Sequence, residues 1–173
     1  MIIREANESD ANGIARVHVD AWRTTYKTIV SDSYLASLNY EKRAERWRQI
    51  FALNDNHFTF VVETKENHIV GFASGGKNRE PNENFAGELY AIYLLENCQG
   101  QGTGKALVKA TAQCFLQQEI SSMLVWVLKE NPFRAFYESL DGKYISEKEI
   151  EIGNAALVEV AYGWKNLEIL LER

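Results

Sequence analysis

The sequence predicts an α/β domain built on a mixed sheet of about seven strands, flanked by about four helices. Its 173 residues fit one ordinary domain over residues 1–173, and 46% hydrophobic residues are enough to form a real core. Apolar stretches of strand length alternate with helical patterns along the chain, which is typical of layered α/β architectures. Residues 88–128 contain a strand, a helix and a strand, so we expect a right-handed crossover between parallel strands there.

The chain is predicted to begin with a strand over residues 1–6, followed by a helix that Ser9 is placed to cap. That helix carries an apolar stripe at helical spacing, formed by Ala11, Ile14, Val17 and Ala21. Residues 22–40 are rich in aromatic side chains and are predicted to be irregular. A second helix is predicted over residues 40–53, with several charged residues on its solvent face.

Strands are predicted in the middle of the chain. The segments FTFVVET (58–64) and HIVGFASG (68–75) flank the turn Lys65-Glu66-Asn67, which indicates a hairpin. Residues 77–87 are polar and are predicted to form a loop. Residues 88–95 are apolar nearly throughout, as expected for a central strand that is buried on both faces.

The C-terminal half is predicted to contain further helices and strands. Pro132 suits the first turn of a short helix, because its missing N–H costs little there. Gly153-Asn154 is predicted to join the last two strands. The predicted helices cover residues 105–118, 132–140 and the tail 165–173, and the predicted strands cover residues 122–128, 143–152 and 157–164.

The segment QGQGTGK lies between a predicted buried strand and a predicted helix. At a helix start the first N–H groups lack partners, and glycines let the backbone approach an anion closely. A phosphate-bearing ligand is therefore predicted, against the simpler alternative of a flexible turn. The Walker pattern does not fit, because only three residues separate Gly100 from Gly104 and Ala106 replaces the hydroxyl residue. The dinucleotide fingerprint also fails, because its third glycine would fall on Lys105.

Gln99, Gly102 and Gly104 form the pattern Gln-x-x-Gly-x-Gly, and the segment NPFRAFYESLDGKYI (131–145) follows the next predicted strand. Together with the order of elements, these segments resemble the GNAT superfamily of acyl-CoA N-acyltransferases over nearly the full chain. The resemblance implies the GNAT-type fold and acetyl-CoA as co-substrate. Asp141 stands where many relatives carry glycine, and Gly142 is expected to take the left-handed position after the helix.

The resemblance also implies a cofactor site. The loop amides would hold the CoA pyrophosphate. The strand segment 92–94 would pair with the pantetheine arm as with an added strand, where a bulge separates it from residues 123–128. Asn131 would bond the pantetheine amides, cap the following helix, or do both. The implied cofactor residues are Ile92, Tyr93, Leu94, Gln99, Gly100, Gln101, Gly102, Thr103, Gly104, Lys105 and Asn131.

Amine acetylation requires an acid for the leaving thiolate and a base for the attacking amine. By resemblance, Tyr137 occupies the position of the family's general acid, and a neutral phenol can donate that proton. Glu88 opens the central strand beside apolar neighbours, which suits a general base that acts directly or through water. The alternatives are that Tyr137 only packs against the sheet, and that Glu88 lies in solvent while ordered water serves as the base.

In this fold the acceptor pocket usually forms from the first helices and the last strands. Trp22 and Tyr26 are four residues apart on a predicted helix, so they share a face and could hold an amine by cation–π contact. Either can equally be a core residue. The predicted function is direct transfer of the acetyl group of acetyl-CoA, in a ternary complex, to a primary amine of a small molecule or protein. The alternative is a non-catalytic acyl-CoA sensor.

Composition argues against several other functions. The net charge of −5 argues against nucleic-acid binding, which needs basic patches. Cys98 and Cys114 cannot form a zinc site alone and have no evident activating base, so neither a metal nor a covalent cysteine intermediate is expected. The charged start and the lack of any apolar run of roughly 20 residues predict a cytoplasmic protein without membrane contact. A homodimer is compatible with the aromatic and apolar C-terminal hairpin.

Overall fold

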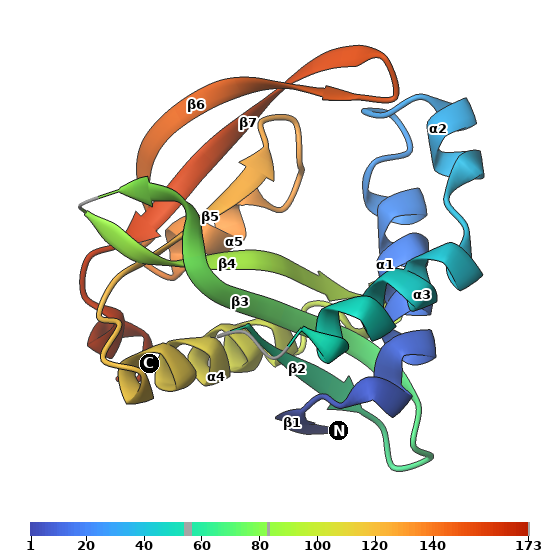
Figure 1. Cartoon of the computed structure of the whole chain (residues 1–173). Coiled ribbons are helices and arrows are strands. Elements are labelled where there is room, and N and C mark those ends of the chain that lie inside the picture. The colour runs from blue at the N-terminus through green and yellow to red at the C-terminus, as the bar shows by residue number, and fades with distance from the viewer. Residues whose placement is uncertain (54–56, 83, 173) are drawn as a thin grey trace.

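The computed structural model describes residues 1–53, 57–82 and 84–172, and it shows a seven-stranded sheet in the order β1-β2-β3-β4-β5-β7-β6 (Figure 1). β4 and β5 are parallel, and the other neighbouring pairs are antiparallel. The predicted mixed sheet is therefore confirmed. The strands are β1 (Ile2–Glu5), β2 (Phe58–Glu63), β3 (Ile69–Asn82), β4 (Phe85–Leu94), β5 (Met123–Leu128), β6 (Lys143–Ile152) and β7 (Ala155–Trp164).

Five α-helices accompany the sheet within the described residues, one more than the approximate prediction. The additional one is α2, which lies in the segment that was predicted to be irregular. Ser31 caps α2 by accepting the backbone N–H of Tyr34, and Leu35 is the buried residue of this helix. The helices are α1 (Ala11–Thr25), α2 (Asp32–Ser37), α3 (Tyr40–Ala52), α4 (Thr103–Gln117) and α5 (Arg134–Ser139), with short 3₁₀ helices at Glu8–Asp10, Glu96–Cys98 and Leu167–Leu170.

The helices cover the two faces of the sheet (Figure 1). Successive strand residues point to opposite faces, so neighbours in sequence join different cores. Val61 and Phe72 pack with residues of α1 and α3, whereas Val62 and Ala73 pack with residues of α4. The sheet therefore separates the α4 layer from the α1–α3 layer.

The structure corrects the predicted helix cap. Asn7, and not Ser9, is the N-terminal cap, because its side chain accepts the backbone N–H of Ser9 at 2.9 Å. The carboxylate of Asp10 accepts the N–H of Asn7 in return, which completes a capping box. A 3₁₀ turn over Glu8–Asp10 precedes α1, and this turn places the cap two residues earlier than the helical stripe suggests.

The polar loop predicted over residues 77–87 is wrong in most of its length, because β3 continues to Asn82 and β4 starts at Phe85. The polar composition misled the prediction, because residues 77–80 lie at or near the surface although they belong to a strand. Side-chain contacts stabilise it: the hydroxyl of Tyr90 donates to the carbonyl of Lys77, and the amide of Asn78 donates to the carbonyl of Phe85 at 2.9 Å. Glu83 in this hairpin, and Arg173 in the predicted tail helix, lie outside the described residues.

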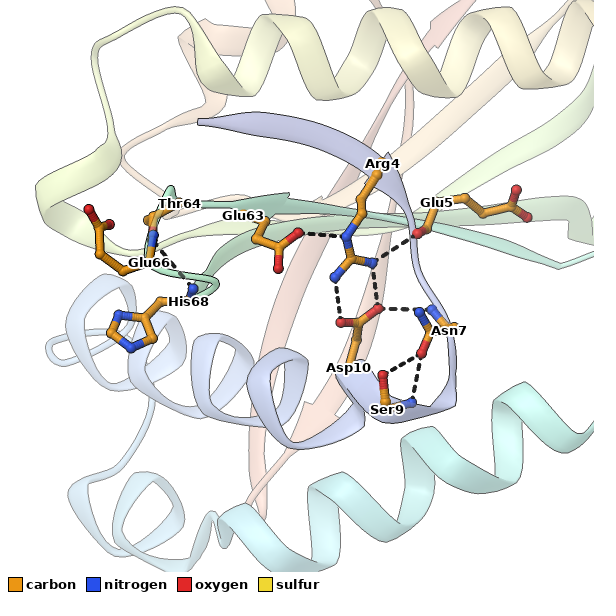
Figure 2. Close-up of polar contacts among 9 residues, drawn as sticks. All are labelled: Arg4, Glu5, Asn7, Ser9, Asp10, Glu63, Thr64, Glu66 and His68. Carbon is orange, nitrogen blue, oxygen red and sulfur yellow. Dashed lines mark hydrogen bonds and ion pairs between the residues drawn. The ribbon is translucent and has the colours of Figure 1, made fainter.

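The side chain of Arg4 links β1 to the neighbouring strand β2 and to the turn before α1 (Figure 2). Its guanidinium donates to both carboxylate oxygens of Asp10 at 2.8 Å and to Glu63 on β2 at 2.7 Å. Asp10 is 6% exposed and Glu63 is 14% exposed, so both carboxylates depend on Arg4 for much of their neutralisation. The bonds from Arg4 hold the pKa of Asp10 below its ordinary value.

No helix among the described residues combines the length and the apolar character needed to cross a membrane.

Candidate active site

The sheet opens in its middle, between β4 and β5. These strands pair only from Gly87–Leu89 to Met123–Val125, after which β4 continues along β3 and β5 continues along β7. Tyr90 is an extra residue in β4, since Leu89 pairs with Gly75 and Ala91 with Ser74. A bulge of this kind bends its strand away from the neighbouring one. The predicted separation and its bulge are therefore both present.

A cavity of about 490 Å³ occupies this opening on the side of the glycine loop. Most of the predicted cofactor residues meet on its wall, although they come from β4, the loop, α4 and the segment before α5. Gln101 and Thr103 are not part of the wall. The wall also includes the predicted acid Tyr137 and the predicted acceptor residue Tyr26. The predicted cofactor residues on the wall are Ile92, Tyr93, Leu94, Gln99, Gly100, Gly102, Gly104, Lys105 and Asn131.

The loop itself has the geometry of an anion cradle. Gly100 and Gly102 have φ values of +70° and +81°, which residues with side chains rarely adopt, and no heavy atom of the described residues lies within 4 Å of a Cβ added at either position. Gly102 is also the N-cap of α4, and no side chain in the described part of the chain caps that helix start. Free N–H groups and the helix dipole therefore face open space, which fits a phosphate group.

The third glycine of the loop has a different role. A Cβ at Gly104 would lie 3.3 Å from the ring of Phe136, so this position keeps α4 close to α5. Gln99 points back to the chain and donates to the carbonyl of Leu94 at 3.1 Å. Gly104 and Gln99 therefore shape the loop, while Gly100 and Gly102 leave it open.

Tyr137 lies on α5 and reaches the same cavity. Its ring stacks on Tyr162 of β7 at 5.8 Å, and the residue is 7% exposed. None of the hydrogen bonds among the described residues involves its hydroxyl. Burial raises the pKa of Tyr137 well above its ordinary value, so the phenol keeps its proton at neutral pH.

The end of α5 differs from the prediction. Asp141, and not Gly142, takes the left-handed conformation, with a φ of +63°. Position 142 requires glycine because a side chain would clash with Trp164: an added Cβ would lie 2.7 Å from the ring of Trp164. The N–H of Gly142 donates to the carbonyl of Tyr137 at 2.9 Å, which closes the helix directly behind the predicted acid.

Asn131 connects the cofactor cavity to α1. Its side-chain oxygen accepts the N–H of Phe133 at 2.8 Å, and its amide donates to the hydroxyl of Tyr26 at 3.1 Å. Trp22 donates in turn to the hydroxyl of Tyr93 at 3.0 Å. Burial raises the pKa of both Tyr26 and Tyr93. The two predicted acceptor residues, Trp22 and Tyr26, therefore belong to a polar aromatic cluster at the opening of the sheet.

A second cavity, of about 540 Å³, reaches the same opening from the other side. It contains Trp22, Tyr26 and Glu88, so it includes both predicted acceptor residues and the predicted base. The residues that it shares with the first cavity are Tyr26, Tyr90, Tyr93, Trp126 and Val127. The two cavities therefore meet where β4 and β5 separate.

Charged residues that the sequence analysis did not identify line this second cavity. Glu88 is 2% exposed and forms an ion pair with Arg79 of β3. Lys148 of β6 lies 4.0 Å from the ring centre of Trp126 and pairs with Glu80 and with Glu159 at 3.4 Å. Burial raises the pKa of Glu159. Arg79 lay in the predicted loop, and the sequence carried no signal for its ion pair, because Glu88 is opposite Gly76 and not Arg79 in the sheet.

His18 packs against Tyr93 of the polar aromatic cluster, and its burial should make the stability of the fold sensitive to acid. It stacks on Tyr93 at 5.0 Å, and its buried Nδ1 has no hydrogen-bond partner among the described residues. Burial, with a smaller contribution from Arg43, lowers the pKa of His18 to about 3. The unfolded chain therefore binds a proton below pH 6.5 that the folded chain does not take up until about pH 3. Stability should fall by up to about 1.4 kcal/mol per pH unit in that range.

Urea unfolding of His18→Gln between pH 4 and 7 measures this effect. The variant is expected to lose less stability on acidification than the wild type, whatever its stability at pH 7. His68→Gln is the control, because His68 is exposed in the β2–β3 turn. Parallel pH profiles for the wild type and His18→Gln would show that the buried ring does not cause the acid sensitivity.

No group of three or more metal-ligating residues was found among the described residues. Cys98 is buried, and burial raises the pKa of the Cys114 thiol, which makes Cys114 a poor nucleophile at neutral pH.

A mixed sheet that opens between two parallel strands, beside a glycine loop at a helix start, is the architecture of acyl-CoA-dependent acyltransferases. The model of the acetyltransferase (GNAT) family matches residues 18–142, and the chain belongs to this family. It is 42% identical over 168 residues to the uncharacterized N-acetyltransferase YuaI of Bacillus subtilis (strain 168), covering 97% of this chain and 95% of that protein. The protein is thus an acyltransferase.

Solved structures share the fold. The PaiA N-acetyltransferase from Thermoplasma acidophilum, in complex with coenzyme A, aligns with a TM-score of 0.70 at 18% identity, over 94% of this chain and 98% of that one. The ribosomal-protein-alanine N-acetyltransferase from Brucella melitensis aligns with a TM-score of 0.73 at 21% identity, over 95% of this chain and 99% of that one. At these identities the similarity establishes the fold.

Proposed function

We propose that this protein transfers the acetyl group of acetyl-CoA directly to a primary amine of a small molecule or protein, in a ternary complex. The meeting of the two cavities at the opening between β4 and β5 carries the proposal. A donor in one cavity and an acceptor in the other would approach each other through the sheet. Bringing the reactants together in this way removes much of the entropic barrier.

The donor cavity suits acetyl-CoA. The free N–H groups at the start of α4 would bind the pyrophosphate. Within the described part of the chain, residues 92–94 have no partner strand on the β5 side. Apart from the carbonyl of Leu94, which accepts a bond from Gln99, their backbone groups on that side are available to the pantetheine arm. Asn131 could also bond the arm, because its side-chain amide has two N–H donors and Tyr26 accepts only one of them.

The reaction needs two proton transfers. As the amine nitrogen bonds to the acetyl carbon, the carbon–sulfur bond breaks and the sulfur takes a proton. We assign that proton to the hydroxyl of Tyr137, because this residue lines the donor cavity. The amine proton goes to the carboxylate of Glu88, directly or through water, because Glu88 lies on the wall of the acceptor cavity.

Calorimetric titration with acetyl-CoA, followed by a thiol assay for CoA release with a panel of amines, tests the proposal. Micromolar or tighter binding together with amine-dependent CoA release is expected. Tight binding without release for any amine would favour the alternative function of an acyl-CoA sensor. Absence of binding would contradict both functions.

Glu88→Gln is expected to lower kcat/KM by about 10²-fold and to remove the basic group from the pH–rate profile. The amide keeps the shape of the side chain and can still accept a bond from Arg79. Acetyl-CoA affinity should not change, because Glu88 lies on the acceptor side. An unchanged pH–rate profile would exclude Glu88 as the base and favour ordered water.

A further inference from the structure

Arg79 presents an incompletely used guanidinium group to the acceptor cavity. Its Nε and Nη2 donate to the carboxylate of Glu88, with Nε–oxygen distances of 3.1 and 3.2 Å. Its backbone N–H donates to the same carboxylate at 3.0 Å. Nη1 makes no hydrogen bond with the described residues. The side chain of Arg79 is 63% exposed, whereas Glu88 is 2% exposed. The buried carboxylate of Glu88 therefore fixes a guanidinium group that a ligand can still reach.

This cation lies close to the opening of the sheet. The guanidinium carbon lies 4.6 Å from the ring centre of Tyr90, and Tyr90 is the bulged residue where β4 leaves β5. Tyr90 also lines both cavities. Stacking on an aromatic ring and pairing with a carboxylate together fix the plane of the guanidinium, so its free edge is preorganised.

The other cation of this cavity, Lys148, is engaged on three sides. It pairs with Glu80 and Glu159, and it lies over the ring of Trp126. An ammonium has three donors, so these contacts largely saturate it. Arg79 is therefore the better candidate for binding an anionic group of a ligand.

We propose that the acceptor is an amine that also carries a carboxylate or a similar anion a few bonds away, as an amino acid does. The free edge of Arg79 binds the anion, and the amine lies beside Glu88. Because Arg79 and Glu88 are in contact, the pair is complementary to a ligand whose opposite charges are also close together. The inference rests on the proposed acetyl transfer, since it names the acceptor class for that reaction.

Matched acceptors test this class directly. Phenylalanine is compared with 2-phenylethylamine and with phenylalaninamide, and lysine with cadaverine, by CoA release at saturating acetyl-CoA. The free acids are expected to have kcat/KM values roughly 10–100-fold higher than the amines without a carboxylate, the effect of a lost charge-assisted hydrogen bond. Equal values, or a preference for cadaverine or the amide, would overturn the inference.

The variant Arg79→Lys tests whether Arg79 binds the anion without removing the positive charge that Glu88 needs in the folded protein. Lysine keeps a charge for Glu88 but lacks the second donor edge, so the ratio of acid to amine in kcat/KM should fall toward one. Arg46→Lys, on the exposed face of α3, is the matched control and should keep the wild-type ratio. An unchanged ratio in Arg79→Lys, with wild-type affinity for acetyl-CoA, would contradict the role of Arg79.

The two proposals fail differently. If no acceptor of any class releases CoA although acetyl-CoA binds, then acetyl transfer is wrong and this inference is wrong with it. If amines are acetylated without regard to a carboxylate, then acetyl transfer stands and only the acceptor class is wrong.

Discussion

Replacing Tyr137 with phenylalanine is expected to reduce kcat for acetyl transfer by roughly 10²–10⁴-fold. The change removes one hydroxyl from a residue that lines the proposed donor cavity, and this hydroxyl makes no hydrogen bond with the described residues. The ring contacts with Tyr162 and Phe136 remain, so folding should be unaffected. Without the phenol, the thiolate must leave unprotonated or take its proton from water.

Stopped-flow measurement of CoA release, together with calorimetry for acetyl-CoA, checks this expectation. The dissociation constant should stay near the wild-type value while kcat falls. Tyr144→Phe is the control, because Tyr144 lies exposed on β6, away from both cavities. A kcat for Tyr137→Phe within a few-fold of the wild type would reduce Tyr137 to a packing residue.

Arg4→Met is expected to destabilise the fold by about 3 kcal/mol. This is the lower end of the range for breaking a buried ion pair, because Arg4 is 31% exposed. The substitution leaves the carboxylates of Asp10 and Glu63 without their shared partner (Figure 2). It also frees β1 from the start of α1. Urea unfolding at pH 7 measures the loss.

Arg48→Met is the matched control. Arg48 is 32% exposed, similar to Arg4, but its partners Glu41 and Glu45 are 80% and 59% exposed. Exposed pairs contribute little, so this loss should be several-fold smaller. Because the pKa of Asp10 is lowered in the fold, the contribution of Arg4 is present above pH 3.8 and is lost as the pH falls through the folded pKa. Equal losses for the two variants would contradict the importance of burial.

Predictions from sequence succeeded where neighbouring residues decide the structure. The apolar run 88–95 became most of β4, and the predicted turn Gly153-Asn154 joins β6 and β7 with both residues at positive φ. They failed where a specific pairing overrides composition. Asn7 is the cap because Asp10, which Arg4 of β1 holds in place, completes its capping box. Residues 77–82 belong to β3, which pairs with β4 at Lys77 and at Asn82, although their composition is that of a loop.

The same division applies to the site. The sequence by itself determined the family and the glycine loop that we propose to bind the donor, because three glycines within five residues set the backbone that an anion approaches. Only the tertiary structure decided which residues form the proposed acceptor side. Arg79, Glu88 and Lys148 come from three different strands, and their ion pairs depend on strand register. Register is a property of the folded sheet. It brings Lys148 to Glu80, for example, although they are 68 residues apart along the chain.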